Sequence, residues 1–198
     1  MSFLSRLVAC VALIGLASCG DTDMSDDPLQ DLGAFEFGVN YVFADKAIPV
    51  GPSRRAQPEE WTSAIAQAMQ NRLGRYSGGQ KYDIGISVEN YALGVPGVPI
   101  IYNPRSTLIV FVNVYDPNTD KWLARQKQLQ VLESTNEKTV LLGTGRTRSR
   151  EEQISGLSFA LAREIEDWLE DQHQANGWFA PIPSFDPGSE GALAQPEG

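Results

Sequence analysis

The sequence predicts an α+β fold in which two helices cover one face of an antiparallel sheet of about four strands. Three segments carry apolar residues at alternate positions and a fourth is a short run that is apolar on both faces; both patterns are typical of strands. Two other segments carry apolar residues at spacings of three and four, which is typical of helices. Their order is strand, helix, three strands, helix. Elements in that order are expected to pack as a two-layer sandwich.

The first strand is expected at residues 34–43, where large apolar residues stand at every second position from residue 35 to residue 43. Because side chains of a strand point alternately to its two faces, one of these sets should lie in the core. We expect the core set to be Phe35, Phe37, Val39, Tyr41 and Phe43, with Glu36, Gly38 and Asn40 on the other face.

The first helix is expected at residues 59–75, after Pro58 in its first turn. Gly78 and Gly79 end the unit. Acidic residues lie in the first turn and basic residues in the last, as the helix dipole favours. The apolar face that we expect to meet the sheet consists of Trp61, Ile65, Ala68, Met69 and Leu73.

Three strands are expected next, at residues 82–93, 106–115 and 122–132. The middle one is apolar on both faces, which predicts a central place in the sheet. Residues 116–121 form a turn that makes the last two strands a hairpin. Asp116, Asn118 and Asp120 resemble the start of a Ca²⁺ loop, but lysines stand where that loop needs glycine and glutamate. Residues 140–142 are a candidate short strand.

The second helix is expected to begin after Ser149 and to run to about His173. Ser149 and Glu152 have the spacing of a capping box, in which each side chain binds the other residue's backbone N–H. The stripe that we expect to be buried consists of Ile154, Leu157, Leu161, Ile165, Trp168 and Leu169.

These elements divide the chain into four parts. Residues 1–18 have the short basic start and apolar run of a signal peptide, too short to cross a bilayer as a helix. Residues 19–33 are acidic and are interpreted as a flexible linker. Residues 34–176 form one α+β domain, and residues 177–198, rich in Pro, Gly and Ala, are interpreted as a disordered tail.

The apolar run ends in Leu16, Ala17, Ser18 and Cys19, which resembles the lipobox of bacterial lipoproteins. The resemblance implies that the thiol of Cys19 receives a diacylglyceryl group, that the chain is cut between Ser18 and Cys19, and that the new amine is acylated, for example with palmitate. Two or more acyl chains make a stable anchor. Gly20 follows, where this family often has Asp for inner-membrane retention, so we expect a periplasm-facing lipoprotein of the outer membrane.

The order of elements over residues 34–174 resembles the small envelope lipoproteins of the curli-secretion and transport-auxiliary group. Those proteins have a helix after the first strand, a long central hairpin and a closing helix. The resemblance rests on this pattern and on no invariant motif. It implies a Gram-negative envelope lipoprotein.

Composition excludes several classes of function. The chain has 25 acidic and 16 basic residues and a formal net charge of −9, so it lacks the basic surface that nucleic acids require. Cys10 and Cys19 both lie outside the expected domain, which leaves no thiol there. His173 is the only histidine and sits at a helix end, where a cap is the simpler role. We therefore expect no metal, no cofactor and no catalytic residue.

Two loops are candidate binding sites. Arg146, Arg148 and Arg150 lie in a Gly- and Thr-containing segment that leads into a helix N-terminus, where an anion can bind. The alternative is that these arginines pair with surface carboxylates. The segment 94–104 carries apolar residues that contact a partner, enter the membrane or fold over the core. The candidate partner contacts are Val98, Ile100, Ile101 and Tyr102.

Three functions follow from these features. The first is a non-catalytic interaction or assembly component of an envelope complex, with a protein partner and a lipid anchor in the membrane. The second is a lipid- or anion-binding auxiliary subunit of a transport system. The third is a hydrolase that uses two carboxylates, for which the sequence nominates no pair.

Mass spectrometry of the chain from its native membrane tests the anchor. We expect the first peptide to begin at Cys19 and to carry the added mass of a diacylglyceryl group and an acyl chain. The lipidated peptide should lose its ester-linked acyl mass on mild base treatment, which serves as the control. An unmodified peptide that runs from residue 1 through residue 19 would overturn the anchor.

Overall fold

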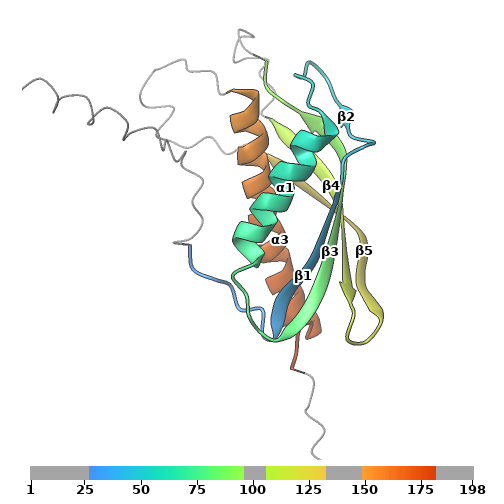
Figure 1. Ribbon diagram of the computed structural model, residues 1–198, viewed down its shortest axis with the longest axis vertical. Helices are drawn as coiled ribbons and strands as arrows, with labels where there is room; N and C mark the ends of the chain where they lie inside the picture. The colour runs from blue at the N-terminus through green and yellow to red at the C-terminus, as the bar shows by residue number, and fades with distance from the viewer. Residues whose placement is uncertain (1–26, 96–105, 133–148, 182–198) are drawn as a thin grey trace, which may run out of the picture.

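The structure is a computed structural model that describes residues 27–95, 106–132 and 149–181 (Figure 1). Its elements follow the predicted order, with one short strand added. They are β1 (Phe35–Phe43), β2 (Ile48–Pro49), α1 (Pro58–Leu73), β3 (Gln80–Ala92), β4 (Thr107–Asp116), β5 (Lys121–Leu132) and α3 (Arg150–Asn176).

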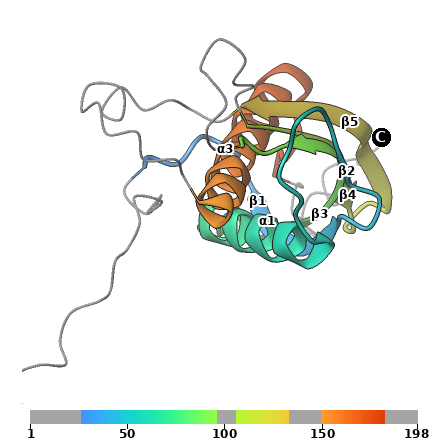
Figure 2. The same ribbon diagram turned by 90° about the horizontal axis from the view of Figure 1, so that it is seen from above.

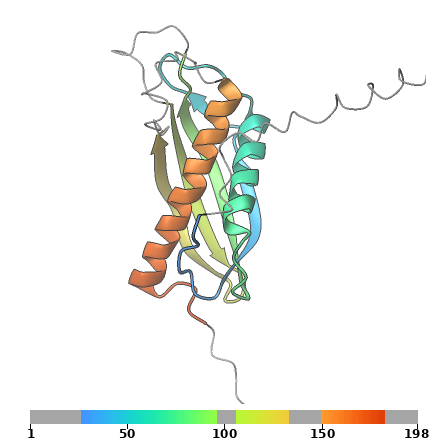
Figure 3. The same cartoon turned by 90° about the vertical axis from the view of Figure 1, so that its left-hand side faces the viewer.

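The two helices lie side by side against one face of the sheet, and the opposite face carries no helix of the described chain (Figures 2 and 3). The strand order is β1-β3-β4-β5, with β2 paired to β3. The predicted two-layer α+β fold is therefore confirmed. The two middle strands are β3 and β4, and the second of these is the strand whose apolar character predicted a central place.

The sheet is mixed, which corrects the expectation of a fully antiparallel one. β1 and β2 run parallel to β3, whereas β3, β4 and β5 are antiparallel to one another. The reason is the connection through α1. A helix between two neighbouring strands carries the chain back along the sheet, so the second strand starts at the same end as the first.

The face of β1 is also corrected. Phe35 is buried, but Val39, Tyr41 and Phe43 are exposed to 46%, 52% and 57%. The ladder to β3 shifts between Phe37 and Asn40, where β1 has one residue more than its partner. Such a bulge exchanges the two faces of a strand. From this point on, the alternation that predicted burial places the aromatic side chains in solvent.

Gly38 makes the bulge possible. A Cβ at this position would lie 2.4 Å from Oδ1 of Asp83 and 2.9 Å from the carbonyl oxygen of Tyr82. The same Oδ1 accepts the Val39 N–H at 2.8 Å, a bond that replaces the ladder partner lost at the bulge. Beyond it, the side-chain amide of Asn40 donates to the Ala66 carbonyl in α1. Asn40 therefore faces the helices, whereas the sequence predicted that it would face solvent.

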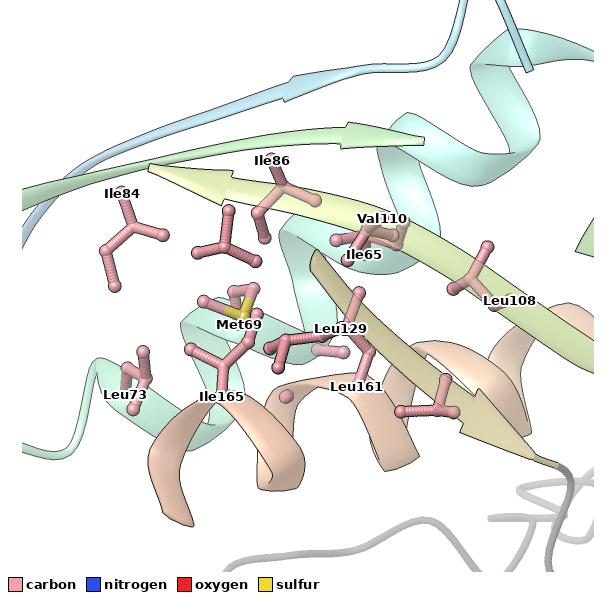
Figure 4. Close-up of a cluster of buried hydrophobic side chains, with 14 of the residues drawn as sticks. Ile65, Met69, Leu73, Ile84, Ile86, Leu108, Val110, Leu129, Leu161 and Ile165 are labelled. Carbon is pink, nitrogen blue, oxygen red and sulfur yellow. The ribbon is translucent and has the colours of Figure 1, made fainter. Parts of the chain in front are cut away.

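The core fills the space between the helices and the inner face of the sheet (Figure 4). It takes the predicted apolar faces of both helices together with alternate residues of β3, β4 and β5, such as Ile84, Val110 and Leu129. The capping box of α3 is confirmed: the Glu152 N–H donates to Ser149 Oγ at 3.0 Å, and the Ser149 N–H donates to Glu152 Oε2 at 2.7 Å.

A buried charge pair joins the two helices. Glu166 of α3 is fully buried and accepts hydrogen bonds from Arg72 Nε and from the Tyr76 hydroxyl, both at 2.5 Å. Burial raises the pKa of Tyr76, and the hydrogen bond to Glu166 and the charge of Glu166 raise it further, so the phenol stays protonated and donates. Without Glu166, the buried Arg72 guanidinium would lack its main partner.

Both ends of the described body extend past the expected domain limits. Asp27, in the segment interpreted as a linker, pairs with Arg72 and Arg163, each at 3.3 Å, and Leu32 is 1% exposed. At the other end, Phe179 is 2% exposed and its carbonyl accepts the Ala34 N–H. Residues 27–33 and 177–181 thus pack with the domain.

Replacing Glu166 with Gln should destabilise the fold. The substitution leaves the buried Arg72 charge with only the partly exposed Asp27 carboxylate as an anionic partner, which costs about 3 kcal/mol of unfolding free energy. Urea unfolding of the purified protein measures it. Arg150→Gln is the control, because the partly exposed Arg150–Glu60 pair is worth less than about 1 kcal/mol. Equal losses in the two variants would contradict the role assigned to Glu166.

Candidate functional site

A groove on the helix-free face of the sheet is the candidate site. Large aromatic side chains stand exposed along it, and Trp122, at 49% exposure, joins those of β1. All four long strands contribute to the lining, which consists of Tyr41, Phe43, Asp83, Gly85, Asn113, Tyr115 and Trp122. The groove has a volume of about 410 Å³. This is within the usual range of small binding sites.

Strand register places six of these seven residues in two rows across the sheet, and Phe43 lies beyond them, paired with Ser87 of β3. In the first row, Tyr41 of β1 pairs with Gly85 of β3, and Gly85 pairs with Asn113 of β4. In the second row, Asp83 pairs with Tyr115 of β4, and Tyr115 pairs with Trp122 of β5. Since neighbouring strands lie about 4.8 Å apart, the groove crosses about 14 Å of sheet.

Gly85 creates the hollow between Tyr41 and Asn113. A Cβ at this position would have Asn113 as its nearest neighbour, with Cβ at 3.9 Å and Nδ2 at 4.0 Å, which is ordinary van der Waals contact. No steric demand of the fold therefore requires glycine here. Its absent side chain leaves the floor of the groove open.

The aromatic walls are held by contacts within the sheet. The rings of Tyr115 and Trp122 lie 5.1 Å apart at an angle of 55°, and the Tyr115 hydroxyl donates to Asp120 Oδ1 at 2.5 Å. That hydrogen bond raises the pKa of Tyr115. The guanidinium of Arg125 stands 4.8 Å from the centre of the Trp122 ring, a cation–π contact. These contacts hold the Tyr115 and Trp122 side chains in place within the sheet.

Asp83 is the carboxylate of the groove. It is half-buried, and its Oδ1 is used by the Val39 N–H at the bulge. Within the described chain, no donor is found for Oδ2. The site therefore combines four aromatic rings, an amide, a glycine and one carboxylate, a lining that suits binding of a group with an apolar body and a positive charge.

Most of the residues that the sequence nominated lie outside the described ranges. They are Ser18, Cys19, Val98, Ile100, Ile101, Tyr102, Arg146 and Arg148. The candidate strand at residues 140–142 lies outside them as well. The lipid anchor and the apolar loop therefore stay predictions.

Arg150 is described, and it pairs with carboxylates. Its Nη2 lies 2.6 Å from Glu60 Oε1 and 3.1 Å from Glu151 Oε1, and its Nη1 donates to the Arg55 carbonyl at 3.1 Å. For this arginine, the structure shows pairing with surface carboxylates, which was the alternative to anion binding. Arg150 therefore ties the start of α3 to the start of α1.

Two other nominated positions have structural roles. The His173 imidazole contacts the Trp178 carbonyl through Nδ1, and the His173 carbonyl accepts the Gly177 N–H that closes α3. Asp116 accepts hydrogen bonds from Asn118 and Thr119 in the predicted hairpin turn. Burial opposes the charged form of Asp116, but these hydrogen bonds outweigh it and lower its pKa.

Neither a metal-binding cluster nor a membrane-spanning helix is found within the described ranges. No group of three or more His, Cys, Asp or Glu residues there is placed to hold a metal ion. No helix in the same ranges is both long and apolar enough to cross a membrane.

The groove was not predicted from the sequence, although one signal was present. Gly85 stands inside a strand that otherwise alternates apolar and polar residues, and a glycine inside a strand often marks a close approach by a ligand or another backbone. The remaining residues come together only through the register of four strands. The bulge also reverses Tyr41 and Phe43, which the alternation had placed in the core.

No family model and no curated protein matches the chain. Solved structures of partial likeness include a candidate lipoprotein from Caulobacter crescentus, with 13% identity, a TM-score of 0.36, and coverage of 73% of this chain and 93% of that one. A DUF330 protein from Xanthomonas campestris has 15% identity, a TM-score of 0.39, and coverage of 74% and 93%. The PelC dodecamer from Paraburkholderia phytofirmans has 11% identity, a TM-score of 0.33, and coverage of 68% and 91%.

Alanine substitutions at two glycines test the open floor of the groove. Gly85→Ala should leave the melting temperature unchanged or raise it, because the new methyl group has room and glycine weakens a strand by about 0.5–1 kcal/mol. Gly78→Ala is the control and should lower it, since a Cβ there would lie 2.3 Å from the Ala34 carbonyl carbon. Thermal unfolding followed by circular dichroism measures both. A destabilised Gly85→Ala would contradict an open floor.

Proposed function

We propose that this chain is a periplasm-facing lipoprotein, anchored through Cys19, that acts as a non-catalytic interaction component of an envelope complex. The groove on the helix-free face of the sheet carries this proposal. Soluble proteins seldom leave large aromatic side chains gathered on one exposed surface unless a partner covers them. Here Tyr41, Phe43 and Trp122 are each about half exposed around one hollow.

The lipobox supports the location in this proposal. Cys19 directly follows an apolar run that is too short to span a bilayer. A diacylglyceryl group on its thiol, with an acylated amine, would hold the chain at the membrane surface. Gly20 at the following position favours the outer membrane, by the resemblance to other lipoproteins.

The composition of the groove supports binding over catalysis. General acid–base chemistry needs groups that exchange protons with a bound substrate, commonly a pair of them. The lining of this groove offers aromatic surface, hydrogen-bonding groups and the single carboxylate of Asp83. Because Arg150 is neutralised by Glu60 and Glu151, the described part of the basic segment supports a structural role for it and not the anion-binding alternative.

Photo-crosslinking in native membranes tests the docking role. A photoreactive phenylalanine analogue in place of Tyr41 should trap one discrete protein partner, because the ring stands on the wall of the groove. The same analogue in place of Glu164 is the control, since this residue is exposed on α3, on the other layer of the fold. Recovery of monomer alone from the Tyr41 position, or the same products from both positions, would sink the docking role.

A further inference from the structure

We infer that the groove receives an arginine or lysine side chain from the protein partner, with Asp83 as the counter-charge and the aromatic rings as the walls. This inference rests on the proposed docking function and adds the chemistry of its occupant. Three observations carry it: the second oxygen of Asp83, the arrangement of the rings and the distribution of positive charge along the chain.

Asp83 is set to accept a positive donor. Its Oδ1 is committed to the Val39 N–H at 2.8 Å, and this bond fixes the orientation of the carboxylate. Its Oδ2 has no donor among the described residues, and the residue lines the groove while half-buried. A partly desolvated carboxylate binds a cationic donor more tightly than a neutral one, because the hydrogen bond is charge-assisted.

The aromatic rings add to the preference for a cation. The faces of Trp and Tyr rings attract guanidinium and ammonium groups, and the attraction grows when water is excluded. Trp122 already makes a cation–π contact within the chain, because the Arg125 guanidinium lies 4.8 Å from its ring centre. Tyr41, Phe43 and Tyr115 line the same groove, around the hollow above Gly85.

The two ends of the chain do not supply the cation. Residues 20–33 and 177–198 contain no lysine and no arginine, so neither terminal segment can place a positive side chain against Asp83. A partner with basic residues would also be drawn toward a chain with a net charge of −9. Charge complementarity therefore favours a basic occupant.

The extent of the groove favours a protein segment over a single small cation. The lining runs across four strands, about 14 Å, and its outer rings stay about half exposed. One ammonium group would fill the hollow above Gly85 and leave that rim wet. A protein segment can insert a basic side chain at the centre and cover the rim with its neighbours, the arrangement in which interface anchors contribute most.

Peptide binding to the full mature lipoprotein in micelles of an uncharged detergent tests the occupant. The probes are the blocked peptide Gly-Arg-Gly-Arg-Gly and its twin with citrulline, which has nearly the same shape and no charge. Calorimetry should show about tenfold tighter binding of the arginine peptide, from the charge-assisted contact. Gly85→Leu should abolish binding of both peptides, because the added side chain fills the hollow.

Two variants with the same change in charge separate a specific contact from general attraction. Asp83→Asn keeps the oxygen that accepts the Val39 N–H, so the fold should persist, and it should reduce the arginine preference to less than about threefold. Asp171→Asn, on the exposed surface of α3, should leave the tenfold preference intact. Equal effects of the two variants, or equal affinity for both peptides, would overturn the inference.

A lipid occupant is a separate outcome. The protein could instead bind phosphatidylcholine vesicles more tightly than the arginine peptide and lose that binding in the Gly85→Leu variant. This result would indicate that the groove receives a choline head group and not a basic side chain. The Tyr41 crosslink separates failure of the docking function from failure of the inferred occupant. A crosslink that is lost in Gly85→Leu, with equal affinity for the two peptides, would support docking and contradict a cationic occupant. The absence of any crosslinked partner would contradict the docking function, whichever peptide binds more tightly.

Discussion

The bond between the Asp83 carboxylate and the Val39 N–H holds the bulge of β1, on which the outward-facing side chains of that strand depend. The extra residue of β1 leaves a backbone donor without its ladder partner, and Asp83 accepts it. Past that point Asn40 faces the helices, while Tyr41 and Phe43 face solvent. Gly38 allows the close approach. The bulge therefore reverses the faces of β1, so that aromatic residues predicted to lie in the core form a wall of the groove instead.

The inner face of the sheet is secured separately. Arg72 and Glu166 are 94 positions apart in the chain, and their buried contact joins α1 to α3, with Tyr76 as a second donor to the same carboxylate. A charge pair with this little exposure requires close geometry, because each charge has lost its water. The helices are therefore fixed against each other by directional bonds as well as by the core.

Features set by neighbours in the sequence were predicted, and features set by distant contacts were not. The helix that starts after Ser149, the apolar face that contains Trp61, and the hairpin turn at Asp116 all follow from spacing over a few residues. The parallel pairing of β1 and the reversal of its face depend on β3, which lies more than 40 positions away. The groove needs four strands in register, so Gly85 alone marked it in the sequence.

The packed segment before β1 limits how far the domain can stand from a lipid attached to Cys19. Asp27 is fixed to α1 and α3 through Arg72 and Arg163. With the lipid on Cys19, only eight residue steps separate the anchor from that fixed point, and an extended chain covers about 3.5 Å per step, or about 28 Å in all. The tether between Cys19 and Asp27 is thus shorter than the α3 helix, which rises about 40 Å over its 27 residues. If Cys19 carries the proposed lipid anchor, a partner must therefore present its docking segment near the bilayer surface, within reach of this tether.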